Sequence, residues 1–221
     1  MILVADKTYE GLMSAVNVSL AKDIYPEELV DVRQYKKQPF KQYLYTKTDF
    51  DNARYLDGLI RGYSGFKIRQ QIKTCLASCE EKAFKIAFDF VHFTLTKQKD
   101  VSMSLKYTQV EEFFYTTQKV LNEKQRLKDS IHFSSNKNGL MFATFKPMND
   151  LCESLSFHFI GCFGRTPYVL YDTTRSKIAL SDGYDAYTGY TSYSPEYIFN
   201  DTFNDYRNLK PRYINVKRTF Y

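Results

Sequence analysis

The stretch from Arg126 to Gly183 constrains the fold of this chain most, because turn-forming residues divide it into short apolar runs. Ile131–Ser135 and Leu140–Phe145 have the length and composition of strands. Between them lies Asn136-Lys137-Asn138-Gly139, whose Asn-Gly pair tolerates the positive φ that a tight hairpin needs. We therefore predict a β-hairpin over residues 131–145.

A helix is predicted directly after this hairpin. Asn149 or Asp150 is placed to cap it, and it runs to about Phe163. Gly164 then ends it in the manner common for glycine just beyond a helix. The apolar residues of this segment recur at helical spacing, at Leu151, Leu155, Phe159 and Cys162.

A second strand pair follows at residues 167–171 and 178–180, across a turn that contains Asp172. Residues 126–183 therefore form a predicted β-β-α-β-β unit. Residues 1–125 are predicted to be mostly helical, with strands at 1–5, 29–32 and 43–45. The longest helical pattern steps by threes and fours from Ile68 to Phe93, which indicates one helix or a broken helix pair.

The last part of the chain, residues 184–221, changes character. Five tyrosines recur every three or four residues among Gly, Ser, Thr, Asp and Pro, which predicts a tyrosine-rich loop up to Pro195. A helix over residues 196–208 and a basic tail complete the chain. We predict one α+β domain over residues 1–221, in which a helical bundle packs with a small mixed or antiparallel sheet built around the β-β-α-β-β unit.

Length and composition limit the class of protein. The chain has 221 residues, 43% of them hydrophobic, and a net charge of +6, which favours a folded core and is compatible with a polyanionic partner. There is no signal peptide and no long apolar segment, so we expect a cytoplasmic protein without a membrane partner. No Gly-rich phosphate loop and no nucleophile elbow is present, and no cofactor is expected.

The four cysteines and three histidines do not have the spacing of a metal site. Cys75 and Cys79 are four residues apart, as are His158 and Cys162, and neither pair has the spacing typical of structural zinc. Each pair also lies within an apolar stripe. We therefore predict core cysteines and no metal site.

Four residues are candidates for catalysis. Asp6 and Glu10 lie at a predicted strand end and helix start, where ligands collect in open α/β sheets and where a helix dipole also favours acids. His158 is a candidate general base, although a histidine within an apolar helix is commonly a packing residue. Asp172 and the neighbouring Arg175 are equally explained as a turn-stabilising pair.

Basic residues gather in two places that suit phosphate contacts. From Tyr206 to the end the chain has five basic residues and no acidic one, so a solvated terminus and a phosphate-contacting arm are both consistent with the tail. The residues predicted to bind nucleic acid are Arg126, Lys128, Arg175, Arg207, Lys210, Arg212 and Tyr213.

The order of these elements and several short motifs resemble a known bacterial family over nearly the whole chain. The first motif is residues 6–16, a strand-end Asp followed by an aromatic, an acidic residue and Gly that lead into a helix. The others are Arg126-Leu127-Lys128 before Ile131-His132-Phe133, the series from Gly139 to Arg175 that includes His158-Phe159, and the closing Arg207-Asn208 with Pro211-Arg212-Tyr213.

This family is assigned to DNA metabolism and DNA repair. Its members accompany a radical-SAM protein and are sometimes fused to a uracil-DNA-glycosylase-like domain, so the resemblance implies such partners and a DNA ligand but no defined reaction. The chain departs from the family pattern at Gln125, Asp129 and Ile214, where His, Gly and Trp are expected. These departures fit a diverged, phage-encoded copy.

Three functions follow as predictions. The first is a nucleic-acid-binding accessory protein in DNA repair or modification. The second is an enzyme that acts on a nucleic-acid base in the manner of a glycosylase, which needs an activating carboxylate and a pocket for a flipped base. The third is a phage interaction factor that binds a host repair or defence protein.

Overall fold

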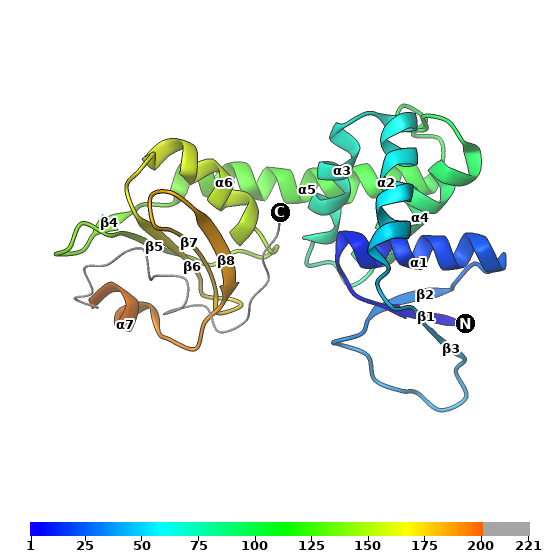
Figure 1. Cartoon of the computed structure of the whole chain (residues 1–221), viewed down its shortest axis with the longest axis horizontal. Coiled ribbons are helices and arrows are strands. Elements are labelled where there is room, and N and C mark those ends of the chain that lie inside the picture. The colour runs from blue at the N-terminus through cyan, green and yellow to red at the C-terminus, as the bar shows by residue number, and fades with distance from the viewer. Residues whose placement is uncertain (201–221) are drawn as a thin grey trace. The chain divides into compact units, whose positions relative to one another are not determined.

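The structure, a computed structural model, describes residues 1–200 of the chain (Figure 1). The chain falls into two compact units, Met1–Leu121 and Asn122–Tyr221. Each unit combines helices with a sheet of its own, so the predicted α+β class is confirmed. The unit boundary and the predicted boundary at residue 125 both lie within helix α5 (Thr108–Ser130). One domain over residues 1–221 stays a prediction.

The first unit contains a three-stranded parallel sheet in the order β2-β1-β3. Its strands are β1 (Ile2–Ala5), β2 (Glu28–Asp31) and β3 (Tyr43–Tyr45), at the three places predicted. Helix α1 (Tyr9–Lys22) connects β1 to β2. The side chain of Thr8 caps α1 by accepting a hydrogen bond of 3.0 Å from the amide of Gly11.

The first unit also contains the helices α2 (Phe50–Ser64), α3 (Lys67–Leu76) and α4 (Ala83–Lys97). The first part of α5 completes it. The long apolar stripe predicted from Ile68 to Phe93 is a broken pair, because residues 77–82 separate α3 from α4. Its apolar side chains enter one core shared by the strands and helices, whose largest fully buried members include Leu12, Ile60, Ile72, Phe88, Phe90 and Phe113.

The second unit is built on a five-stranded sheet in the order β4-β5-β6-β7-β8. Only β5 and β6 pair in parallel, so the sheet is mixed. Helix α6 (Cys152–Phe163) connects β5 to β6. The predicted β-β-α-β-β order is therefore confirmed, with strands β4 (Ser134–Ser135), β5 (Met141–Phe145), β6 (Tyr168–Asp172) and β7 (Lys177–Ser181).

The predicted loop from residue 184 to Pro195 is wrong, because it contains a strand. β8 (Ala186–Tyr190) pairs antiparallel with β7, with Leu180 opposite Tyr187. Turn-forming residues favour a loop here, but Tyr and Thr also favour strands, and the segment pairs along the whole length of β7. Tyr187 also packs against the core of this unit.

The predicted side-chain cap of α6 is also wrong. The cap position is Leu151, which makes no side-chain capping bond. Asn149 and Asp150 instead bond to residues far along the chain: the amide nitrogen Nδ2 of Asn149 donates to Glu123 at 2.5 Å, and Asp150 pairs with Lys177. The predicted end at Gly164 is confirmed, with a φ of 56° there.

The central strands of the second unit are buried on both faces (Figure 1). One face carries α6, where the hydroxyls of Ser156 and Tyr168 lie 2.7 Å apart. The other carries α7 (Pro195–Asn200), whose Ile198 joins the core on that side. The predicted helix over residues 196–208 extends beyond the described residues. No helix within residues 1–200 is both long and apolar enough to cross a membrane.

Candidate functional site

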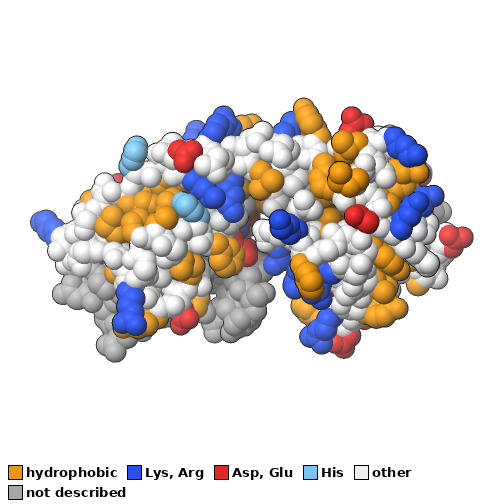
Figure 2. Space-filling model, turned by 90° about the horizontal axis from the view of Figure 1, so that it is seen from above, with side chains coloured by type: hydrophobic (Ala, Val, Ile, Leu, Met, Phe, Trp, Pro, Cys, Tyr) orange, Lys and Arg blue, Asp and Glu red, His pale blue; other side chains and the backbone are white. Residues whose placement is uncertain are grey.

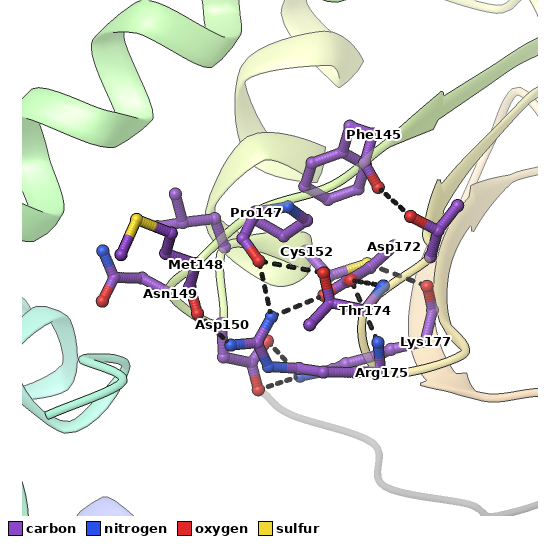
Figure 3. A network of polar contacts seen from close by, with 12 residues as sticks. Phe145, Pro147, Met148, Asn149, Asp150, Cys152, Asp172, Thr174, Arg175 and Lys177 are labelled. Carbon is purple, nitrogen blue, oxygen red and sulfur yellow. Dashed lines mark hydrogen bonds and ion pairs between the residues drawn. The ribbon is translucent and has the colours of Figure 1, made fainter. Parts of the chain in front are cut away.

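The turn after β6 is organised by the buried carboxylate of Asp172 (Figure 3). Its Oδ1 accepts hydrogen bonds from the backbone amides of Thr174 at 2.8 Å and Arg175 at 3.2 Å. Its Oδ2 accepts from Nη1 of Arg175 at 3.1 Å. Burial raises the pKa of Asp172, and the nearby positive charge of Arg175 and the two amides oppose that rise.

The guanidinium of Arg175 also reaches the segment that leads into α6. Nη1 donates to the carbonyl of Pro147 at 3.4 Å, and Nη2 donates to the carbonyl of Met148. The hydroxyl of Thr174 donates to the same Pro147 carbonyl at 3.0 Å. Asp172 and Arg175 therefore tie the β6–β7 turn to the segment before α6, which is a positioning role that needs no substrate.

A second charged pair lies beside this turn (Figure 3). Nζ of Lys177 donates to both carboxylate oxygens of Asp150 at 2.8 Å. Burial alone would lower the pKa of Lys177, but attraction to Asp150 raises it above its ordinary value. The thiol of Cys152, 3.7 Å from the carbonyl of Lys177, is buried, and burial holds its pKa well above the usual range. It is therefore a neutral thiol and a poor nucleophile.

The basic face of the second unit, defined as Lys124, Lys128 and His158, is differently built. The two lysines lie on the last turns of α5, and His158 lies on α6. Across the described part of the chain, neither lysine forms an ion pair or hydrogen bond. Figure 2 shows Lys and Arg side chains beside a histidine and a hydrophobic area on this unit.

The charges of this face act on one another. Burial lowers the pKa of Lys124, and the positive charge of Lys128 lowers it further. Burial, Lys128 and Lys124 together lower the pKa of His158, while Asp129 raises it. Lys124 and Lys128 are four residues apart on one helix, an arrangement in which like charges destabilise the helix. An anion bound here would relieve this repulsion.

The remaining candidates lie in the first unit. Oδ2 of Asp6 accepts a hydrogen bond of 2.6 Å from the hydroxyl of Thr48, and Glu10 lies 3.8 Å from Nη2 of Arg69. Both carboxylates have protein partners. Asp6 follows β1, the central strand of the parallel sheet, so it lies at the carboxyl edge predicted for it.

Sequence reasoning missed a buried cluster next to these residues. The hydroxyl of Tyr9 donates to Oδ1 of Asp57 at 2.5 Å, and Nε of Arg61 lies 2.9 Å from Oδ2. The guanidinium of Arg69 lies over the ring of Tyr9, 5.1 Å from its centre. Burial and the hydrogen bond to Asp57 raise the pKa of Tyr9 far above its ordinary value. Only the helical spacing of Asp57 and Arg61 was a signal of this cluster in the sequence.

The structure brings together some of the predicted site residues. Asp172 contacts Arg175, and Lys128 acts on His158. Asp6 and Glu10 belong to the other unit. Arg126 is exposed on α5 but lies about 200° around the helix from Lys128, so these two predicted residues do not share a face. Four further candidates lie outside the described residues: Arg207, Lys210, Arg212 and Tyr213.

The cysteine prediction is partly wrong. Cys75 and Cys152 are buried, but Cys79 and Cys162 are exposed. Cys79 lies beyond the end of α3, and Cys162 lies on the outer side of α6, where its Sγ is 3.7 Å from Nε2 of His158. Within residues 1–200 no group of three or more His, Cys, Asp and Glu side chains is arranged to hold a metal ion.

Two comparisons with known proteins bear on identity. No curated protein matches the chain. The model of a domain of unknown function, DUF4130, matches residues 81–216, which is more than half of the chain and includes α4, α5 and every strand of the second unit. The chain therefore belongs to the DUF4130 family.

Proposed function

We propose that this protein binds nucleic acid as an accessory factor in DNA repair or modification. The observation that carries the proposal is the basic face, where Lys124 and Lys128 form no ion pair with an acidic residue among the described residues. Neighbouring lysines that are not engaged in ion pairs favour a polyanion, because each phosphate contact releases a counterion. The sequence resemblance to a DNA-repair family supports the same assignment. A radical-SAM protein and a glycosylase-like protein are the partners that this resemblance suggests.

Arg175 contributes less to this proposal than the sequence suggested. Its guanidinium is engaged by Asp172 and by the carbonyls of Pro147 and Met148. A phosphate would have to compete with these three partners. The contribution of the basic tail, beyond residue 200, stays a prediction.

The proposal is tested by fluorescence anisotropy with labelled DNA at several salt concentrations. Binding should weaken steeply between about 50 and 200 mM salt. The double variant Lys124→Gln/Lys128→Gln should bind more weakly, with a smaller salt slope. The control, Lys137→Gln/Lys146→Gln, removes the same charge from two exposed lysines elsewhere in the unit. No binding to any nucleic acid, or equal losses in both variants, contradicts the proposal.

A protein-interaction role is the second candidate, and a different observation favours it. Large apolar side chains of the first unit are exposed, among them Phe40, Phe66 and Met103, and exposed apolar area is typical of protein contacts. Recovery of the same host protein from a lysate with and without nuclease treatment would favour this role. An enzymatic role on a nucleic-acid base stays a prediction, whose test is loss of activity on alanine substitution of Asp6, Glu10, His158 or Asp172.

A further inference from the structure

We propose that the loop between β2 and β3, residues 32–42, binds single-stranded nucleic acid: its lysines contact phosphates, and an unpaired base stacks on the ring of Phe40. The loop belongs to the first unit and lies outside the residues that match the family, so it is a surface additional to the basic face. The inference rests on the proposed function, to which it adds a second contact surface and a class of ligand.

The loop is strongly basic. Residues 33–47 contain five basic residues and no acidic one. Arg33 and Lys41 pair with carboxylates of β2, at 2.8 and 3.9 Å between the charged atoms. Lys36 and Lys37 are exposed, and neither forms an ion pair or a hydrogen bond within residues 1–200. Two adjacent lysines are therefore available to a polyanion.

Contacts with β3 hold this part of the loop in place. Tyr35 packs edge-on against two residues of the strand, with its ring centre 5.0 Å from that of Tyr43 and 5.4 Å from that of Tyr45. The backbone amide of Gln38 donates a hydrogen bond of 2.8 Å to the hydroxyl of Tyr43. The two unpaired lysines lie between Tyr35 and Gln38. Because both ends of this segment are anchored, less conformational entropy is lost when a ligand binds to it.

Phe40 adds an aromatic ring next to these charges. The side chain is fully exposed, and among the described residues it contacts no other ring and no cation. Its φ is 63°, a conformation that a bulky side chain rarely adopts. No core contact of the ring offsets the cost of this conformation, which is typical of functional segments. Three residues separate Phe40 from Lys37, so their Cα atoms lie within about 11 Å of each other.

The loop is open to a large ligand because it faces away from the helices of its unit. Leu44 packs against the core that the helices share, so the alternation along β3 directs Tyr43 and Tyr45 to the other face of the sheet. Figure 1 shows the loop extending from the sheet on the side opposite α1.

Unpaired lysines together with an exposed ring favour a single strand over other polyanions. A duplex keeps its bases stacked inside and offers the loop only phosphates. In a single strand every base has a face that can stack on an aromatic side chain. An acidic protein surface would pair with the lysines but does not supply planar rings next to its charges. DNA and RNA share this chemistry, and the experiments below include both.

The absence of tryptophan from the chain allows a direct test of stacking. In Phe40→Trp the indole is the only one in the protein, and its fluorescence should be quenched as oligo-dT of roughly 15 nucleotides is added. Phe66→Trp is the matched control, since Phe66 is 83% exposed in the same unit but has the guanidinium of Arg61 over its ring, 5.8 Å from the centre. Its fluorescence should not change. Quenching in both variants, or in neither, overturns the assignment of Phe40.

Affinities measured by anisotropy complete the test. Phe40→Ala should weaken the binding of oligo-dT or oligo-rU roughly tenfold and leave duplex binding unchanged. Lys36→Gln/Lys37→Gln should lower the salt slope for the single strand by about 1.4, or about 0.7 for each phosphate contact. Lys67→Gln/Lys99→Gln removes the same charge from two exposed lysines outside the loop and should leave the slope unchanged. The tighter binder of the two oligonucleotides identifies the strand as DNA or RNA.

The outcomes separate this inference from the proposed function. Binding that is lost in Lys124→Gln/Lys128→Gln but unchanged in every loop variant overturns the inference and leaves a nucleic-acid-binding protein. Equal quenching of Phe40→Trp by a duplex overturns the single-strand assignment. If an oligo-glutamate peptide of the same length binds as tightly as the oligonucleotides, the ligand of the loop is an acidic protein and the inference is wrong. If neither strand nor duplex binds, the proposed function is wrong as well.

Discussion

Asp172 and Arg175 form an ion pair, 3.1 Å from Oδ2 to Nη1, in which the carboxylate is fully buried while the guanidinium reaches the carbonyls of Pro147 and Met148. The same carboxylate accepts hydrogen bonds from the backbone amides of Thr174 and Arg175. One side chain therefore fixes the turn and orients the arginine that connects it to the segment before α6.

Replacing Asp172 should consequently destabilise the second unit. Asp172→Ala leaves a guanidinium and two amides without their acceptor, and we expect the free energy of unfolding to fall by about 3–5 kcal/mol. Asp172→Asn retains an oxygen for the amides and should cost less, about 1–2 kcal/mol. Urea denaturation followed by circular dichroism measures both. If both variants lose the same free energy of unfolding, the ion pair with Arg175, and not the hydrogen bonds to the backbone amides of the turn, is what stabilises the unit.

Gly183 offers a backbone test in the same unit. Its φ is +91°, and an added Cβ would lie 2.2 Å from the carbonyl oxygen of Arg165. Gly183→Ala should therefore lower the free energy of unfolding by about 2–3 kcal/mol. Gly161→Ala is the control, because Gly161 lies within α6 in open space and alanine should raise stability by about 1 kcal/mol. Similar changes in the free energy of unfolding at the two positions would contradict the predicted clash at Gly183.

An element of this fold is predictable from the sequence where the contacts that determine it join residues close together in the chain. Gly164 ends α6 and Asp172 pairs with Arg175 three residues on, and both relationships can be read from neighbouring residues. β8 was missed because its pairing partner β7, and not its own turn-forming composition, makes it a strand. The cap of α6 was misplaced because Asn149 bonds to Glu123, far along the chain.

The same distinction applies to the candidate sites. That Lys124 and Lys128 lie on one side of a helix follows from their spacing, but their electrostatic effect on His158, 30 positions beyond Lys128, depends on the fold. Tyr9 and Asp57 are separated by 48 positions, and no local pattern links them. Sequence reasoning identified residue types suited to a site and could not determine which of them meet.

The buried hydrogen bond between Tyr9 and Asp57 makes a prediction for the first unit. Tyr9→Phe removes the donor at 2.5 Å but leaves Asp57 its ion pair with Arg61 at 2.9 Å. We expect the free energy of unfolding to fall by about 1.5–2 kcal/mol, as for hydrogen bonds to charged groups. Tyr55→Phe, at an exposed position on α2, should have no effect in the same urea titration. No change of stability in Tyr9→Phe would mean that Arg61, with Arg69 at 3.8 Å, is sufficient to satisfy the Asp57 carboxylate.

We expect the proposed binding of DNA to depend on pH through His158. In the free protein burial, Lys128 and Lys124 lower its pKa, against the opposing effect of Asp129, so the imidazole is neutral at about pH 7.5. A phosphate on the two lysines favours the imidazolium and raises that pKa, so binding takes up a proton and tightens as the pH falls. One proton gives at most about a tenfold change in affinity per pH unit.

The measurement is the affinity for labelled DNA from about pH 7.5 to about pH 6, the range in which histidine titrates. His158→Gln should bind with little dependence on pH over this range, because the group that takes up the proton is gone. His132→Gln, at an exposed histidine of the same unit, should keep the wild-type dependence. If His158→Gln instead retains the full dependence, the proton is taken up elsewhere, and the phosphate does not lie beside α6.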